Sequence, residues 1–141
     1  MIRDYRPADI DQVLAIWLAA SIEAHHFIEP AFWQSKMGEM RNVYIPASET
    51  FVYEDEGVVV GFYSLYENTL AAIFVAPGSQ GKGVGSVLLD DAKSRRAKLK
   101  LTVYKENAAS IRFYRNNGFS VLQEQIDEHT GHSELIMEHR S

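Results

Sequence analysis

The chain has 141 residues, a length that fits one domain with a substantial buried core. Its composition is 46% hydrophobic and 23% charged, with a net charge of -5, which is typical of a globular protein and argues against a nucleic-acid partner. It contains no cysteine, which excludes disulfides, a thiol nucleophile and thiolate metal ligands, and agrees with the reducing cytoplasm in which we expect it.

Hydrophobic periodicity in the first half of the chain predicts two helical segments and three strands. The N-terminal residues lack the apolar centre of a signal peptide, and no apolar run is long enough to span a membrane. The predicted elements are a strand at 2–5, an amphipathic helix ending near Glu23, a helical segment at about 31–44 that stops before Pro46, and a hairpin of strands 50–53 and 58–66.

In the second half, strands alternate with helices. They are a strand at 70–75, a helix at about 83–96, a strand at 99–104, a helix at 107–117, and two last strands at about 120–127 and 133–139. No repeat, low-complexity tract or long linker interrupts the chain, so we expect a single domain over residues 1–141. This order of elements favours an α+β fold with a mixed sheet.

The stretch 74–89 predicts a site for a phosphate or pyrophosphate. An apolar strand there meets a glycine-rich turn and the start of a helix, with glycines at alternate positions, Gly81, Gly83 and Gly85. The first N–H groups of a helix have no internal partner and favour an anion. The spacing matches neither a P-loop, because Gly83 follows Lys82, nor the G-x-G-x-x-G dinucleotide fingerprint.

A second motif follows the next predicted strand: Asn107-x-x-Ser110-x-x-x-Tyr114-x-x-x-Gly118-Phe119. Asn107 and Tyr114 are two helical turns apart and share one helix face. Together with the earlier Val75-x-Pro77 and Gln80-x-x-Gly83-x-Gly85, this pattern resembles the GNAT family of N-acetyltransferases. Among its members, the chain is similar to small bacterial single-domain proteins related to protein-lysine acetyltransferases.

The resemblance implies an α/β/α layered fold with a mixed, mostly antiparallel sheet. Its two neighbouring parallel strands, here 70–75 and 99–104, would splay apart around acetyl-CoA, the cosubstrate. The backbone of Phe74 and Val75 would pair with the pantetheine arm and donate to the oxyanion. The resemblance further assigns to the cofactor Gln80, Gly81, Lys82, Gly83, Val84, Gly85, Ser86, Asn107, Ser110 and Tyr114.

Acetyl transfer to an amine requires a neutral nucleophile, a stabilised oxyanion and a proton for the departing thiolate. The resemblance makes Tyr114 the general acid. The general base stays open, because strand 70–75 lacks the glutamate that many family members carry. The alternatives are Glu67 acting through a water chain, His25 or its neighbour His26, which titrate near neutral pH, and loss of the proton to bulk water.

Charge is distributed unevenly along the chain. Residues 82–115 carry nine basic and three acidic side chains, a net +6 that coincides with both motifs and leaves -11 for the remainder. The acidic remainder would attract a cationic acceptor. We expect a primary amine, either a protein lysine or N-terminus or a small amine, and the aromatic segment from His25 through Trp33 tilts the choice toward a protein.

Three further expectations concern metals, partners and the rival function. His129, His132 and His139 flank a glycine-containing turn without cysteine, which favours a surface hairpin over a metal site. We expect no metal, no nucleic acid and no membrane partner, and a monomer or homodimer. The rival hypothesis is a non-catalytic acetyl-CoA-binding regulatory module.

Overall fold

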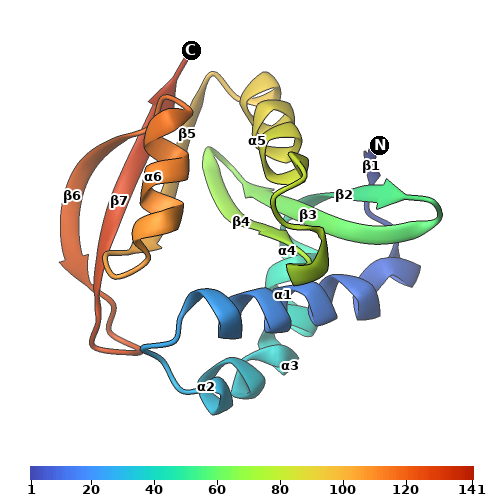
Figure 1. The fold of residues 1–141 in the computed structure, drawn as a ribbon, viewed down its shortest axis with the longest axis horizontal. Coiled ribbons are helices and arrows are strands. Elements are labelled where there is room, and N and C mark those ends of the chain that lie inside the picture. The colour runs from blue at the N-terminus through green and yellow to red at the C-terminus, as the bar shows by residue number, and fades with distance from the viewer.

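A computed structural model describes all residues, Met1–Ser141, as a seven-stranded sheet with helices on both faces (Figure 1). The sheet order is β1-β2-β3-β4-β5-β7-β6, and every neighbouring pair except β4 and β5 is antiparallel. The strands are β1 (Ile2–Asp4), β2 (Glu49–Asp55), β3 (Val58–Tyr66), β4 (Thr69–Val75), β5 (Lys98–Tyr104), β6 (Ser120–Ile126) and β7 (Ser133–Arg140). The predicted mixed, mostly antiparallel sheet is confirmed.

The helices agree with the sequence-based boundaries except in the segment after the first helix. They are α1 (Ile10–Ala24), α2 (Pro30–Ser35), α3 (Met37–Glu39), α4 (Ile45–Ala47), α5 (Val84–Arg95) and α6 (Ala108–Asn116). Short 3-10 turns lie at Pro7–Asp9 and Pro77–Ser79, and one π-helical turn lies at Met40–Tyr44.

The expectation of one helical segment that stops before Pro46 was wrong. The segment is interrupted near Lys36 and continues through Pro46 to Ala47. A proline ring normally clashes with the carbonyl four residues earlier in an α-helix. Here the preceding turn is the wider π form, in which the Ile45 N–H donates to the Met40 carbonyl. The wider turn therefore accommodates Pro46 without ending the helical path.

Two apolar clusters lie on opposite faces of the sheet and produce the layered architecture. On one face, α5 packs its buried leucines, Leu88 and Leu89, against β3, β4 and β5. On the other face, α1 packs Val13 and Trp17 against Val52 and Phe62 of the central strands. The sequence periodicity of α1 and α5 predicts these buried faces, because apolar residues at helical spacing form one stripe.

The close packing of α5 depends on Gly61 in β3. A Cβ atom at Gly61 would lie 3.1 Å from Leu88 Cδ1, 3.2 Å from Val84 Cγ1 and 3.2 Å from the Phe74 carbonyl oxygen. These contacts are tighter than ordinary van der Waals distances, so a side chain here would push α5 away from the sheet. Gly61 thus sets the position of the helix whose N-terminus follows the glycine-rich turn.

Strands β4 and β5 are joined at one end only. The single aligned pair is Thr69 with Lys100, and the Lys100 N–H donates to the Asn68 carbonyl at 2.8 Å. Beyond this pair the strands diverge, as the resemblance implied. Ile73, Phe74 and Val75 at the far end of β4 are only half-buried although they are apolar. The sheet is therefore two halves hinged at Thr69 and Lys100, with an uncovered strand edge between them.

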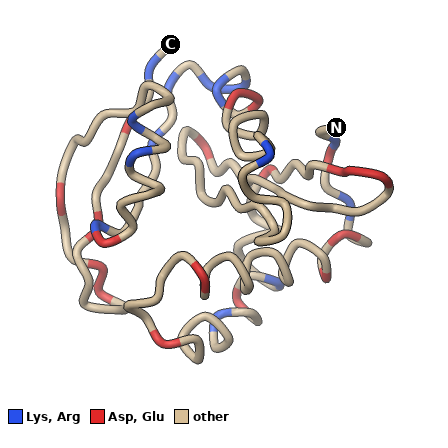
Figure 2. Tube along the Cα trace, viewed as in Figure 1, with Lys and Arg blue, Asp and Glu red and all other residues tan.

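Charges follow the same division (Figure 2). Lys and Arg residues gather on α5, β5 and α6, and Asp and Glu residues mark the β2–β3 hairpin at the right of the view. None of the helices is both long and apolar enough to cross a membrane.

Candidate active site

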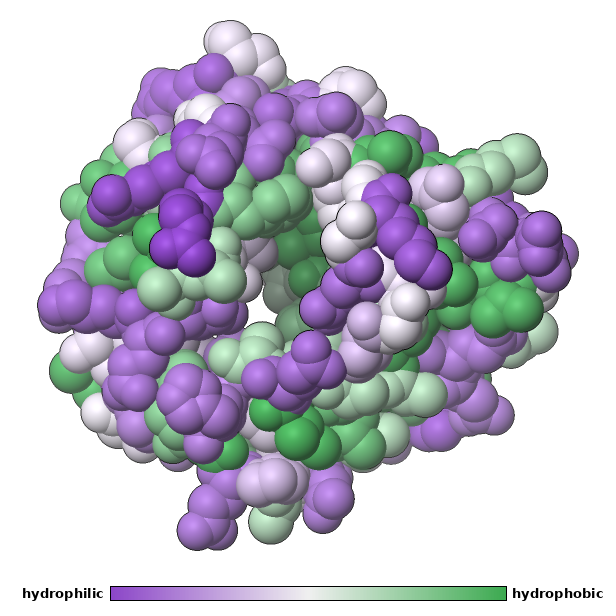
Figure 3. Space-filling view, in the orientation of Figure 1, coloured by the Kyte–Doolittle hydropathy of each residue, from purple (hydrophilic) through white to green (hydrophobic).

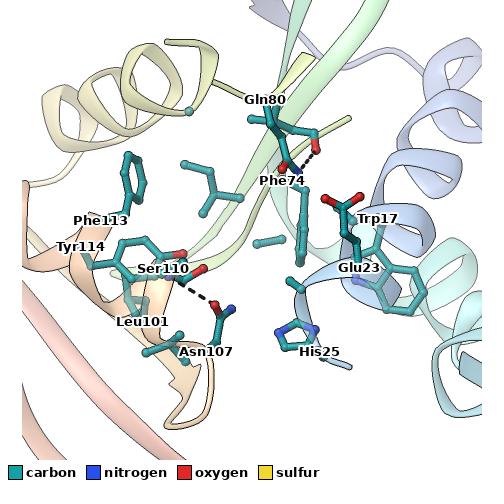
Figure 4. Close-up of a pocket in the computed structure, with 18 of the residues that line it drawn as sticks. Trp17, Glu23, His25, Phe74, Gln80, Leu101, Asn107, Ser110, Phe113 and Tyr114 are labelled. Atoms are coloured by element: carbon teal, nitrogen blue, oxygen red, sulfur yellow. Dashed lines mark hydrogen bonds between the residues drawn. The ribbon is translucent and has the colours of Figure 1, made fainter. Parts of the chain in front are cut away.

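A cleft of about 960 Å³ occupies the space between the diverging strands. Figure 3 shows the surface hollowed at the centre of the view, with apolar side chains in its depth. Its walls are supplied mainly by the facing edges of β4 and β5, the turn before α5, the exposed face of α6 and the C-terminal end of α1 (Figure 4). Both sequence motifs therefore meet in one cleft, although about twenty residues separate them along the chain.

The glycine-rich turn forms the end of the cleft where α5 begins. Gly81 and Gly83 have φ angles of +77° and +85°, which a side chain strains, and Gly83 is the N-cap of α5. Six of the seven predicted loop residues line the cleft: Gln80, Gly81, Gly83, Val84, Gly85 and Ser86. Lys82 is exposed and does not line it. Backbone N–H groups and the helix dipole, rather than a cationic side chain, make this end attractive to an anion.

Gln80 fastens the turn to β4, because its side-chain Nε2 donates to the Val75 carbonyl at 3.1 Å. The same bond shows that the Val75 carbonyl points away from β3. On the opposite edge of β4, the Ala76 N–H donates to the Val60 carbonyl at 2.8 Å.

Because backbone groups alternate in direction along a strand, the amides of Val75 and Ile73 face the cleft and the Phe74 amide faces β3. Phe74 instead offers its ring to the cleft, stacked on Phe62 with centroids 5.8 Å apart. Of the predicted amides, that of Val75 is therefore open to the cleft and that of Phe74 is not, and the Ile73 amide is open as well.

Helix α6 presents Asn107, Ser110 and Tyr114 on its cleft face (Figure 4). Asn107 caps the helix, since its side-chain Oδ1 accepts from the Ser110 N–H at 3.2 Å. This orientation leaves its Nδ2 group free to donate. The Tyr114 ring packs against Phe113 and Phe119, and its hydroxyl makes no hydrogen bond within the protein.

Burial raises the pKa of Tyr114 to about 12. At neutral pH the Tyr114 hydroxyl is therefore protonated and available as a donor in the cleft. This state suits the role of proton donor that the resemblance gives it.

His25 lies on the opposite wall, just beyond the end of α1 (Figure 4). Its Nδ1 donates to the Ser21 carbonyl at 2.8 Å, because a carbonyl can only accept. The neutral ring therefore carries its free lone pair on Nε2. Burial lowers the pKa of His25, and the ring stacks on Trp33 with centroids 4.9 Å apart. His25 is held neutral, with one nitrogen available to accept a proton.

Aromatic contacts close the cleft at the end remote from the glycine-rich turn. Phe27 in the α1–α2 connection packs edge-on against Tyr104 and His132, at 5.6 Å and 5.1 Å between centroids. Tyr104 in turn donates its hydroxyl to Asp127, next to the turn that joins β6 and β7. The two halves of the sheet, which separate after Thr69, are thereby joined again across the cleft.

The structure does not bring Glu67 to this site. Glu67 is exposed at the β3–β4 turn with a φ of +54°, and the Arg96 side chain donates to its backbone carbonyl at 2.9 Å. It does not line the cleft, and neither does the exposed His26. Two carboxylates that sequence reasoning missed do line it, Glu23 and Glu134. The signal for Glu23 was its spacing, three residues after Ala20 on the inner face of α1.

No three His, Cys, Asp or Glu side chains come together in a way that could hold a metal ion. His132 pairs with Glu106 at 3.2 Å, and His139 packs against Phe119 with centroids 5.4 Å apart. These histidines of the C-terminal hairpin serve packing and pairing.

The positive φ of Gly83 allows a test of whether the glycine-rich turn binds coenzyme A. We expect Gly83→Ala to weaken coenzyme A binding by roughly 10-fold, because a side chain in the left-handed region costs about 1–2 kcal/mol at the helix N-terminus. The matched control is Gly78→Ala in the same turn, where φ is not positive and a Cβ meets nothing within 4 Å. Isothermal titration calorimetry measures both affinities, and equal affinities would contradict the assignment of the loop.

The lowered pKa of His25 predicts that the free energy of unfolding decreases as the pH falls. The unfolded chain binds the proton more readily than the folded one, so the stability due to neutral His25 is present above about pH 6.5 and lost as pH falls below it. His25→Asn should therefore lose less unfolding free energy than the wild type between neutral and acidic pH, measured by urea denaturation. His26→Asn, an exposed neighbour, should keep the wild-type pH dependence; an unchanged slope in His25→Asn contradicts a buried neutral ring.

Comparison with known proteins agrees with this geometry. Residues 46–121 match the family model described as Acetyltransferase (GNAT) domain. The peptidyl-lysine N-acetyltransferase YiaC of Escherichia coli is 32% identical over 86% of this chain and 84% of its own. The peptidyl-lysine N-acetyltransferase YjaB of Escherichia coli is 30% identical over 90% of this chain and 87% of its own.

The solution structure of apo-form YjaB from Escherichia coli superposes with a TM-score of 0.87 at 26% identity, covering 99% of this chain and 96% of that one. The two motifs, the splayed sheet and these relatives agree, and they confirm the resemblance inferred from the residues. The chain belongs to the GNAT family of acetyltransferases, enzymes that transfer an acetyl group from acetyl-CoA to an amine.

Proposed function

We propose that this chain acetylates the ε-amine of lysine in proteins or peptides by direct attack on acetyl-CoA. The observation that carries the proposal is the placement of a protonated phenol, Tyr114, and a neutral imidazole, His25, on opposite walls of one cleft. The relatives YiaC and YjaB, both named peptidyl-lysine N-acetyltransferases, support lysine as the acceptor.

The residues of the cleft fit acetyl-CoA along one continuous path. The turn from Gln80 to Ser86 offers N–H groups to the pyrophosphate at the start of α5. The open amides of Ile73 and Val75 and the free Asn107 Nδ2 suit the polar groups of the pantetheine arm. The thioester then lies near Tyr114, at the point where the phosphate end of the cleft meets the acceptor end.

Each chemical step has a group to perform it. The Nε2 atom of His25 accepts the proton that the amine must lose before or during attack. An open amide of β4 donates to the oxyanion that forms at the thioester carbonyl. Tyr114 donates a hydrogen bond or proton to the sulfur as the carbon–sulfur bond breaks. The products are the amide and coenzyme A, and solvent restores the starting protonation states.

The rival function, a regulatory module that binds acetyl-CoA without turnover, draws support from the lack of a carboxylate on β4 and from the position of Glu67 outside the cleft. We favour catalysis because the proton acceptor missing from β4 has a counterpart in His25.

An acceptor panel separates the two functions. We expect thiol release from acetyl-CoA with lysine-containing peptides, none with the same peptides acetylated at Nε, and slower release with short polyamines. Mass spectrometry of the peptide should place the acetyl group on the lysine. If acetyl-CoA binds and no amine in the panel is acetylated, the result would favour the non-catalytic regulatory module.

Tyr114→Phe should lower kcat by roughly 10- to 1000-fold, the range for loss of general acid catalysis, with coenzyme A affinity within about 2-fold of wild type. The ring packing against Phe113 and Phe119 is retained, so the fold should persist. Tyr66→Phe, an exposed tyrosine that does not line the cleft, is the matched control. An unaltered kcat in Tyr114→Phe would reduce Tyr114 to a packing role.

A further inference from the structure

The charged residues of the cleft are all of one sign. Among its lining residues the carboxylates are Glu23 and Glu134, and no lysine or arginine is present. The lining also includes the aromatic side chains of Trp17, Trp33 and Phe74. Glu23 is exposed to solvent in the structure, and an acceptor that covers it would reduce the screening of its carboxylate by water.

Of the two carboxylates, Glu23 is the one without a partner. Glu134 accepts a hydrogen bond from the Gln125 side chain at 2.7 Å, whereas Glu23 makes no hydrogen bond or ion pair. In Figure 4 the Glu23 carboxylate is on the α1 side of the cleft, across from Tyr114 and Asn107. It is therefore free to meet an incoming group.

The position of Glu23 is unfavourable for the helix that carries it. Glu23 is in the last turn of α1, where the helix dipole and the unpaired carbonyls already concentrate negative charge. A carboxylate there destabilises the helix end slightly unless a cation approaches. A residue that destabilises its own helix is expected at positions that serve ligand binding.

A second polar group faces the same space. His25 has only 8% of its surface exposed, yet its Nε2 has no protein partner and the ring lines the cleft. The His25 Nε2 atom is not among the fully buried unpaired atoms, so it is accessible from the cleft and open to an incoming donor. A primary ammonium has three N–H donors, enough to reach both a carboxylate and an imidazole lone pair.

We propose that Glu23 binds the protonated form of the acceptor amine and thereby selects cationic alkylamines such as a lysine side chain. The inference rests on the proposed function and names how that site recognises its acceptor. The rings of Trp17 and Phe74 contact the aliphatic stem, and the ammonium lies against the Glu23 carboxylate. From there one N–H reaches His25 Nε2, which takes the proton and leaves a neutral amine for attack. Glu23 is a binding and positioning residue in this scheme, and the proton leaves by way of His25.

The test compares two acceptors that differ in charge and hardly in shape. One is a lysine peptide, and the other carries an aminooxy group in place of the terminal aminomethyl group, a nucleophile that stays neutral near pH 7. Glu23→Gln should raise KM for the lysine peptide by roughly 10-fold with kcat within about 2-fold, because an ion pair in the ground state is lost. KM for the aminooxy peptide should hardly change.

Glu29→Gln is the matched control. It removes the same charge at the N-cap of α2, at an exposed residue that does not line the cleft, so both acceptors should behave as with wild type. The melting temperature of Glu23→Gln should stay level or rise, since a charge opposed to the helix dipole is removed. Equal losses with the lysine and aminooxy peptides would overturn the proposal, as would an effect of Glu29→Gln equal to that of Glu23→Gln.

A binding measurement keeps this inference separate from the proposed function. The coenzyme A complex is titrated with n-butylammonium chloride and followed by NMR of the tryptophan indole signals. Wild type and Glu29→Gln should bind it, and Glu23→Gln should bind at least about 5-fold more weakly. That result would support the ammonium site even if no lysine peptide were acetylated, and equal affinities in all three proteins would refute it.

Discussion

The backbone pairing of Thr69 with Lys100 is the constraint on which the rest of the structure depends. Parallel strands normally continue to pair along their length, and these two separate after one register position. Everything beyond that point follows: β4 keeps an unpaired edge, its apolar end stays half-buried, and a cleft of about 960 Å³ opens between the halves of the sheet. The cost of leaving strand amides unpaired is tolerable where a ligand with its own amides can take the vacant positions.

The two ends of the cleft differ in the charge that they favour. At one end, backbone N–H groups at the start of α5 favour an anion, with no cationic side chain among the lining residues. At the other end, Glu23 and aromatic rings favour a cation with an aliphatic stem. In the proposed function, an anionic cosubstrate and a cationic acceptor would enter from opposite ends and meet beside Tyr114.

Helix α1 connects the hydrophobic core to the cleft. Its inner face, including Val13 and Trp17, packs against the central strands and fixes its axis. Its C-terminal end then delivers Glu23 and His25 to the wall opposite α6. Phe27, just beyond, packs against Tyr104 and His132 of the other half. The same helix therefore stabilises the fold, shapes the acceptor end and helps hold the cleft at a defined width.

The sequence by itself determined the features that depend on neighbours along the chain. The order of strands and helices, the left-handed glycines before α5 and the shared face of Asn107 and Tyr114 follow from local periodicity and backbone sterics. Only the tertiary structure decided that Glu23 and His25 reach the cleft while Glu67 does not, that Ile73 rather than Phe74 has the open amide, and that a π turn carries the helix through Pro46. The physical reason is that these outcomes depend on strand register and on packing between segments distant in the sequence, and one residue of register or one helical turn is enough to reverse which groups face the ligand.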